Sequence, residues 1–114
     1  FYVIRKQEMK KSNVLRIIDF IGEEKGIYSF TTFLKIFLRK EKFEYVDFLS
    51  YGLNKKYLIN AGFKLINPKK NDIIVPDYFS PLVKKNTPIW FFAITKQKNR
   101  LMIYKGDGDQ DRPS

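Results

Sequence analysis

Residues 16–22, RIIDFIG, and residues 44–50, EYVDFLS, decide the fold of this chain. Each is an apolar run with an Asp-Phe pair near its middle, and such runs are typical of strands buried on both faces of a sheet. The sequence between them carries the apolar stripe of an amphipathic helix, with spacings of three and four: Phe30, Phe33, Leu34, Phe37 and Leu38. Strand, helix and strand joined by short turns predict a right-handed crossover with parallel strands.

The flanking segments extend this unit. Residues 1–5, FYVIR, predict a strand that forms an antiparallel hairpin with the strand at 14–23. Ser29 is the predicted N-cap of the long helix, and Asn54 is the predicted N-cap of a short helix over 55–61 that ends before Gly62. Further strands are predicted at 63–67, 89–95 and 101–104. The fold class is therefore α/β, a mixed sheet with two helices, in one domain over 1–105 with a polar tail over 106–114.

Composition limits the chemistry. The chain of 114 residues has no cysteine and no histidine, so it lacks the thiolate and imidazole groups that serve most often as nucleophile, base or metal ligand, and no metal site is predicted. The absence of cysteine fits a reducing compartment, and we expect a cytoplasmic protein without a membrane span. The net charge of +10 favours anionic partners.

Two carboxylates stand out. Asp19 and Asp47 lie in the middle of the two apolar strands. Alternation along the first strand places Asp19 on the same face as Leu15 and Ile17. Because the two strands should be neighbours, we expect both carboxylates near one cleft, where they could act as a base and a positioning group. The alternative is that each one pairs with a cation at the sheet.

The order of elements resembles the C-terminal half of the GNAT acyl-CoA N-acyltransferase superfamily. The motifs that carry the resemblance are the two Asp-Phe strands and the segment from Asn54 to Ala61-Gly62-Phe63. Together with the closing GDGDQDRP they are similar to uncharacterised GNAT-like proteins of bacterial surface-polysaccharide gene clusters. The family's N-terminal elements are not in this sequence, so we expect it to be part of a longer protein.

The resemblance implies acetyl-CoA or another acyl-CoA as cosubstrate, and an amino sugar or another small amine as acceptor. The end of the first strand would pair with the pantetheine arm, the turn before the long helix would hold the pyrophosphate, and the thioester would lie between two splayed strands. The implied cofactor-binding residues are Ile18, Phe20, Gly22, Lys25, Gly26, Ile27 and Asn54. The family's general-acid tyrosine aligns with Leu58, so the adjacent Tyr57 joins Asp19 and Asp47 as a catalytic candidate.

Two other functions stay open. The turn at 24–29 has a single glycine, where the family has a glycine-rich loop, which is compatible with a non-catalytic interaction module. An exposed first strand could then pair with another chain and form a homodimer. A nucleic-acid-binding domain is the lesser alternative, because the basic charge is not matched by a base-reading helix or an aromatic RNA-binding strand motif.

Overall fold

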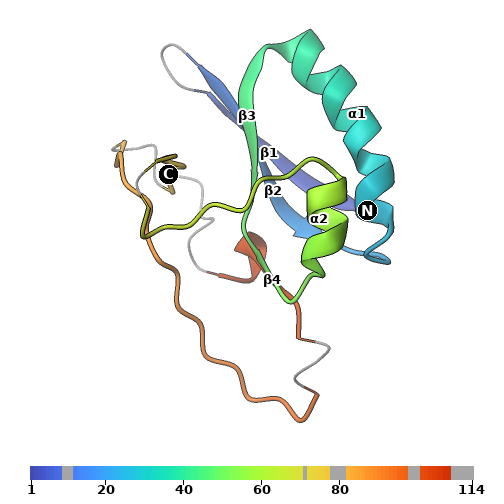
Figure 1. The fold of residues 1–114 in the computed structure, drawn as a ribbon, viewed down its shortest axis with the longest axis vertical. Helices are drawn as coiled ribbons and strands as arrows, with labels where there is room; N and C mark the ends of the chain where they lie inside the picture. Colours follow the sequence, from blue (N-terminus) through green and yellow to red (C-terminus); the bar gives the residue numbers. More distant parts are fainter. Residues whose placement is uncertain (9–11, 71, 78–81, 98–100, 109–114) are drawn as a thin grey trace.

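The computed structural model describes residues 1–8, 12–70, 72–77, 82–97 and 101–108. Within these ranges it has a three-stranded sheet, a two-stranded sheet and two α-helices, which confirms the predicted α/β class with a mixed sheet (Figure 1). The elements are, in order, β1 (Tyr2–Glu8), β2 (Asn13–Phe20), α1 (Gly26–Glu41), β3 (Phe43–Phe48), β4 (Ser50–Tyr51), α2 (Lys55–Asn60), β5 (Ile103–Tyr104) and the 3-10 helix η2 (Lys105–Asp107).

The larger sheet has the strand order β1-β2-β3. β1 pairs with β2 in antiparallel fashion, and β2 pairs with β3 in parallel fashion across α1. The predicted hairpin and the predicted parallel strand–helix–strand unit are therefore confirmed. β2 is the central strand, and β1 and β3 pair with its two edges.

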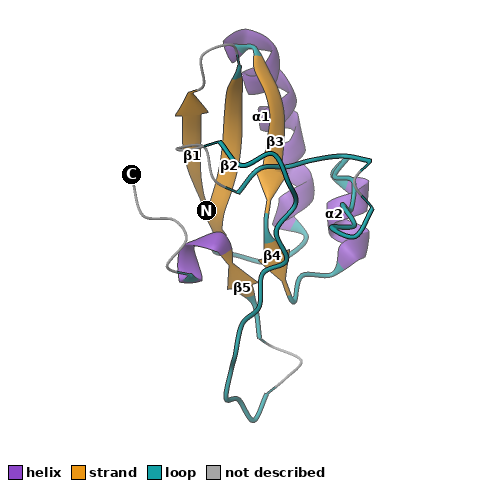
Figure 2. Ribbon diagram, turned by 90° about the vertical axis from the view of Figure 1, so that its left-hand side faces the viewer, coloured by secondary structure: helices purple, strands orange, loops and turns teal. Residues whose placement is uncertain are grey.

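One helix and several loops cover the two faces of this sheet. α1 lies on one face, where Leu34 packs against Leu15, Ile17 and Phe43, whereas the C-terminal loops lie on the other (Figure 2). α1 begins at Gly26, so its N-cap is Lys25 and not the predicted Ser29, because the preceding turn closes with its own backbone hydrogen bonds. The Ser29 hydroxyl instead donates to the Gly26 carbonyl at 2.9 Å.

A β-bulge changes the alternation along β2. The β1–β2 register shifts between Val3 and Ile4. Val3 pairs with Asp19 and Ile4 pairs with Ile17, so Ile18 has no partner in β1. Phe20 therefore packs with Ile27 of α1, while Asp19 lies beside Gly106 of η2. The prediction that Asp19 shares a face with Leu15 and Ile17 was wrong, because an extra residue in a strand reverses the side-chain alternation beyond it.

The C-terminal half has less regular structure than predicted. Residues 63–67 and 89–95 are not in strands, and the return at 101–104 is reduced to β5, which pairs with β4 in the register Ser50↔Tyr104 and Tyr51↔Ile103. A strand needs a partner edge, and neither of these two segments has one among the described residues. Phe63 instead packs its ring near Phe48, with ring centroids 6.2 Å apart.

The short helix and the tail follow local signals. The Asn54 side chain accepts a hydrogen bond from the Lys56 amide at 3.0 Å, and Gly62 follows α2 at φ +90°, both as predicted. The first residues of the polar segment, Gly106 and Asp107, belong to η2, and the Asp107 carboxylate accepts a hydrogen bond from the Tyr104 amide at 2.7 Å. In the described ranges, none of the helices is long and apolar enough to cross a membrane.

Candidate functional site

An open hollow of about 460 Å³ lies where β2 ends and α1 begins. It is shallow and largely open to solvent. Four predicted cofactor-binding residues line it, namely Phe20, Gly22, Lys25 and Gly26, and the remaining lining residues are Phe1, Tyr2, Glu23 and Ser29. The hollow thus combines aromatic rings with the turn that precedes the long helix.

The other predicted cofactor-binding residues lie outside this lining. Ile18 and Ile27 are buried in the core. Asn54 caps α2, and its backbone amide donates to the Glu24 carboxylate at 2.7 Å. Asn54 therefore ties α2 to the turn beneath the hollow instead of contributing to its surface.

The turn before α1 is built from backbone contacts. Gly22 has φ +148°, a conformation that favours glycine. The amides of Gly26, Ile27 and Tyr28 donate to the carbonyls of residues 23–25 at 2.8, 3.1 and 3.2 Å. These amides are already engaged, so a phosphate would be attracted mainly by the helix dipole and by Lys25. Lys25 also forms an ion pair with Glu23 at 2.6 Å, and both side chains are 75% exposed.

Tyr2 forms one wall of the hollow. Its ring stacks on Phe30 of α1 with centroids 3.7 Å apart, and its hydroxyl donates to the Gly26 carbonyl at 3.2 Å. Burial raises the pKa of Tyr2 to about 12, with a smaller contribution from Tyr104. Tyr2 is therefore a neutral hydrogen-bond donor that fixes the start of α1 against the sheet.

β2 and β3 separate beyond Ile17 and Phe48, which are the last partners in their register. β2 continues to Phe20 along β1. An aromatic side chain lies between the two diverging strands: the Tyr104 ring stacks on Phe48 at 5.7 Å and meets Phe20 edge to face at 6.5 Å. The place where the resemblance puts the thioester is thus filled by the buried ring of Tyr104, which the sequence did not indicate.

The catalytic candidate Asp47 forms an ion pair with Arg16. Its carboxylate accepts from Arg16 Nε at 3.1 and 2.9 Å and from Arg16 Nη2 at 2.6 Å. The strand register places Asp47 opposite Arg16 and not opposite Asp19. The geometry therefore matches the alternative reading, in which the carboxylate pairs with a cation.

Asp19 and Tyr57 occupy other places. Asp19 is half-buried and accepts from the Phe20 amide at 2.7 Å. Tyr57 lies half-buried on α2. Across the described part of the chain, no hydrogen bond or ion pair joins any two of the three catalytic candidates. A single constellation of Asp19, Asp47 and Tyr57 is not assembled.

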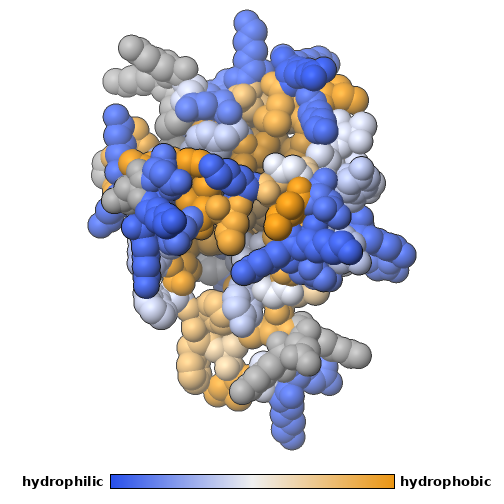
Figure 3. Space-filling model, viewed as in Figure 1, coloured by the Kyte–Doolittle hydropathy of each residue, from blue (hydrophilic) through white to orange (hydrophobic). Residues whose placement is uncertain are grey.

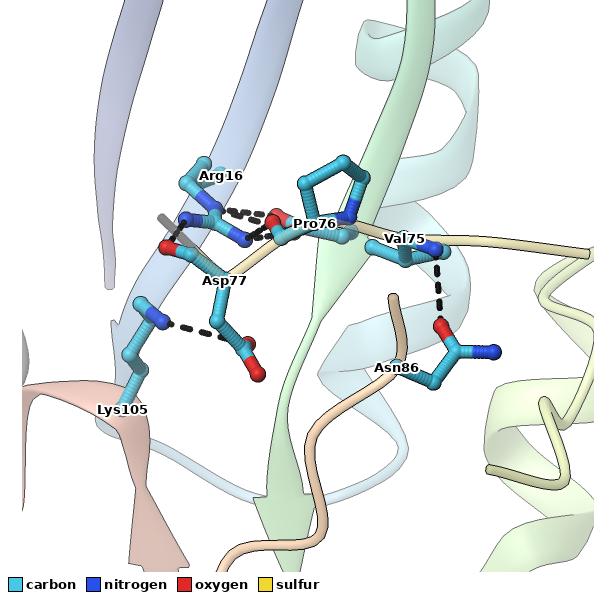
Figure 4. A network of polar contacts seen from close by, with 7 residues as sticks. Arg16, Val75, Pro76, Asp77, Asn86 and Lys105 are labelled. Carbon is cyan, nitrogen blue, oxygen red and sulfur yellow. Dashed lines mark hydrogen bonds and ion pairs between the residues drawn. The ribbon is translucent and has the colours of Figure 1, made fainter. Parts of the chain in front are cut away.

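Arg16 is the centre of a polar network on the face of the sheet away from α1 (Figure 4). It is 4% exposed, and beyond Asp47 it donates to the Asp77 and Pro76 carbonyls at 2.8 and 2.7 Å. The buried Lys105 amine lies 3.7 Å from the Asp77 carboxylate. The network fastens the 75–77 segment and η2 across β2 and β3. The sequence did carry a signal for it, since an arginine within an otherwise apolar strand requires a partner.

Tyr45 lies near the charges of Arg16 and Asp47. Burial raises its pKa to about 12, and Asp47 acts in the same direction. Its hydroxyl is buried and has no hydrogen-bond partner among the residues that the structure describes.

Comparison of the chain with protein-family models, curated proteins and solved structures finds no match. Any function must therefore be argued from the geometry of the site and from the motifs quoted above.

Proposed function

We propose that the chain is an acyl-CoA-dependent N-acyltransferase, or the C-terminal part of one, that acts on an amino sugar or another small amine. The observation that supports this most is the hollow between the end of β2 and the start of α1, because four residues implied by the GNAT resemblance line it. Its position after a parallel strand and before a helix is one that suits phosphate groups.

The residues of the hollow fit such a cosubstrate in part. Lys25 and the positive end of the α1 dipole would attract the pyrophosphate, and the rings of Tyr2 and Phe20 would give the pantetheine arm an apolar wall. Glu23 opposes an anion, and the engaged amides reduce what the turn can offer. We therefore expect weak binding. When bound, the thioester would supply the activated acyl group.

Asp19 is the carboxylate assigned to acid–base work in this proposal. It lies at the end of β2, adjacent in sequence to Phe20 of the hollow but on the face of the sheet beside Gly106, and it is not engaged by a cation in the described residues. It would accept the proton that the acceptor amine loses on acylation. Asp47, held by Arg16, is assigned a structural role.

Calorimetric titration with acetyl-CoA tests the proposal. We expect measurable binding that weakens by roughly threefold to tenfold in Lys25→Ala, the range for loss of one charge contact to phosphate. Lys35→Ala, at an exposed position of α1 outside the hollow, should bind like the unmodified chain. Asp19→Asn should abolish acyl transfer while leaving acetyl-CoA binding unchanged. Absence of heat at millimolar acetyl-CoA would refute the proposal.

A non-catalytic interaction module is the second proposal. Two observations favour it: the ion pair of Asp47, and the position of β1 as an end strand of its sheet. The outer edge of β1 could pair with a second copy. Sedimentation should then show a homodimer that Ile4→Pro, in the middle of β1, dissociates; a monomer at all accessible concentrations would exclude this route.

A further inference from the structure

The loop before β5 carries a run of exposed apolar side chains. Residues 89–95 read IWFFAIT, and Trp90, Phe92 and Ile94 are 89, 88 and 91% exposed. These three residues alternate along the chain. Large apolar side chains are rarely left this accessible in a group without a partner.

The loop projects from the rest of the molecule. Figures 1 and 2 show it extending beyond both sheets at the end where β4 and β5 lie, and Figure 3 shows apolar side chains there next to strongly hydrophilic ones. Phe91 contacts the two-stranded sheet, because the centroid of its ring lies 4.7 Å from that of Tyr51 in β4. The exposed side chains are thus presented at one end of the protein, where a flat surface could reach them.

Charge is segregated around the same loop. Between Asp77 and Asp107 the sequence has no acidic residue, whereas it has six basic ones: Lys84, Lys85, Lys96, Lys98, Arg100 and Lys105. Lys105 is buried beside the Asp77 carboxylate and does not contribute to the charge of the surface, which leaves five basic residues in this stretch. Of the described ones, Lys84, Lys85 and Lys96 are exposed on either side of the apolar run. An occupant should therefore combine an apolar layer with negative charge.

We propose that residues 89–95 dock this protein on an anionic lipid surface. Tryptophan and phenylalanine are suited to the boundary between headgroups and acyl chains, and flanking lysines gain energy near anionic headgroups. The loop has no backbone ladder in the described residues, so it lies in the hydrated headgroup region and not in the hydrocarbon core.

Two other occupants fit the observations less well. Single-stranded nucleic acid would use aromatic rings for stacking, but it gains little from the exposed Ile94 and Leu82. A second copy would bring another strongly basic chain against this basic loop.

The only tryptophan of the chain, Trp90, makes the test direct. Its fluorescence emission is recorded while phosphatidylcholine vesicles with or without phosphatidylserine are added. We expect a blue shift and co-sedimentation with the phosphatidylserine vesicles only. The shift should decrease as salt is raised well above about 0.1 M, where the Debye length becomes shorter than 10 Å.

Matched variants separate the two contributions. The double variant F92S/I94S should weaken vesicle binding by roughly tenfold or more, since two apolar contacts are lost. The double variant K84E/K85E should also weaken binding, because it replaces attraction to the anionic headgroups with repulsion. The control I36S/I59S changes two apolar residues on the helices that are 65 and 62% exposed, and it should bind like the unmodified chain.

Three results would overturn the proposal. Emission that stays constant with every vesicle would exclude lipid docking. A blue shift that grows with protein concentration without vesicles would assign the loop to a second copy. A shift with single-stranded RNA but not with vesicles would assign it to nucleic acid.

Discussion

Removal of one partner of the Arg16–Asp47 pair should reveal how much of the fold depends on it. The two side chains are 5 and 15% exposed, and Arg16 Nη2 lies 2.6 Å from Asp47 Oδ2. In Asp47→Asn, the guanidinium keeps the carbonyls of Pro76 and Asp77 but loses its counter-charge. Breaking such a buried pair from one side costs about 3–5 kcal/mol, which is a large share of the ~5–15 kcal/mol of a typical domain.

A double-mutant cycle measures the interaction itself. Urea unfolding of Asp47→Leu, Arg16→Met and the double variant should give a coupling energy of roughly 2 kcal/mol, because the double variant leaves no unpaired charge in the sheet. The double variant still deprives two backbone carbonyls of a donor, so it should remain less stable than the unmodified chain.

The exposed pair Lys25–Glu23 is a matched control. Its shortest N–O distance is also 2.6 Å, but both side chains are 75% exposed. Its cycle should give less than about 0.5 kcal/mol, as is usual for solvated pairs. Equal coupling energies for the two pairs would refute the argument that burial, and not distance, sets the strength of the Arg16–Asp47 contact.

Three further predictions rest on single positions. Gly52→Ala should destabilise the chain by about 3 kcal/mol or more in urea unfolding, because Gly52 has φ +90° and a Cβ would overlap the Leu101 carbonyl. The control Gly26→Ala has open space around it and should change the stability little. Equal losses of stability in the two variants would contradict this reasoning. Tyr45→Phe should stabilise by about 1 kcal/mol, since it removes a buried hydroxyl that has no partner in the described residues, and a loss of stability would contradict it. The pKa values of Tyr2 and Tyr45 are raised from 10.0 to about 12, so the unfolded chain loses these two protons at a lower pH than the folded chain does. The urea midpoint should therefore fall as pH rises from about 10 to about 12, and it should fall less in Tyr45→Phe. A constant midpoint would be inconsistent with the raised pKa values.

Part of the candidate site could be read from the chain. The GNAT resemblance implied that the turn before α1 holds a pyrophosphate, and Gly22, Lys25 and Gly26 of this turn do line a hollow. The pairing of Asp47 with Arg16 was not specified, because it depends on the register of two strands separated by α1. The position of Tyr104 between Phe20 and Phe48 depends on where a segment more than fifty residues later returns to the sheet.

The sequence by itself determined the elements whose signals are local. The apolar stripe of α1, the cap of α2 by Asn54 and the turn at Gly62 depend on residues within a few positions of one another. The apolar runs around Ile17 and Val46 likewise specified two buried strands and, with the helix between them, a parallel pair.

Only the tertiary structure decided which segments gain a partner and which way side chains face. Residues 89–95 have the composition of a strand but no neighbouring edge in the described chain, so their backbone has no ladder. The bulge at Ile18 reversed the direction of Asp19, although nothing in its immediate sequence required this. Strand pairing and register are set by contacts between residues far apart in the chain, which a local pattern cannot encode.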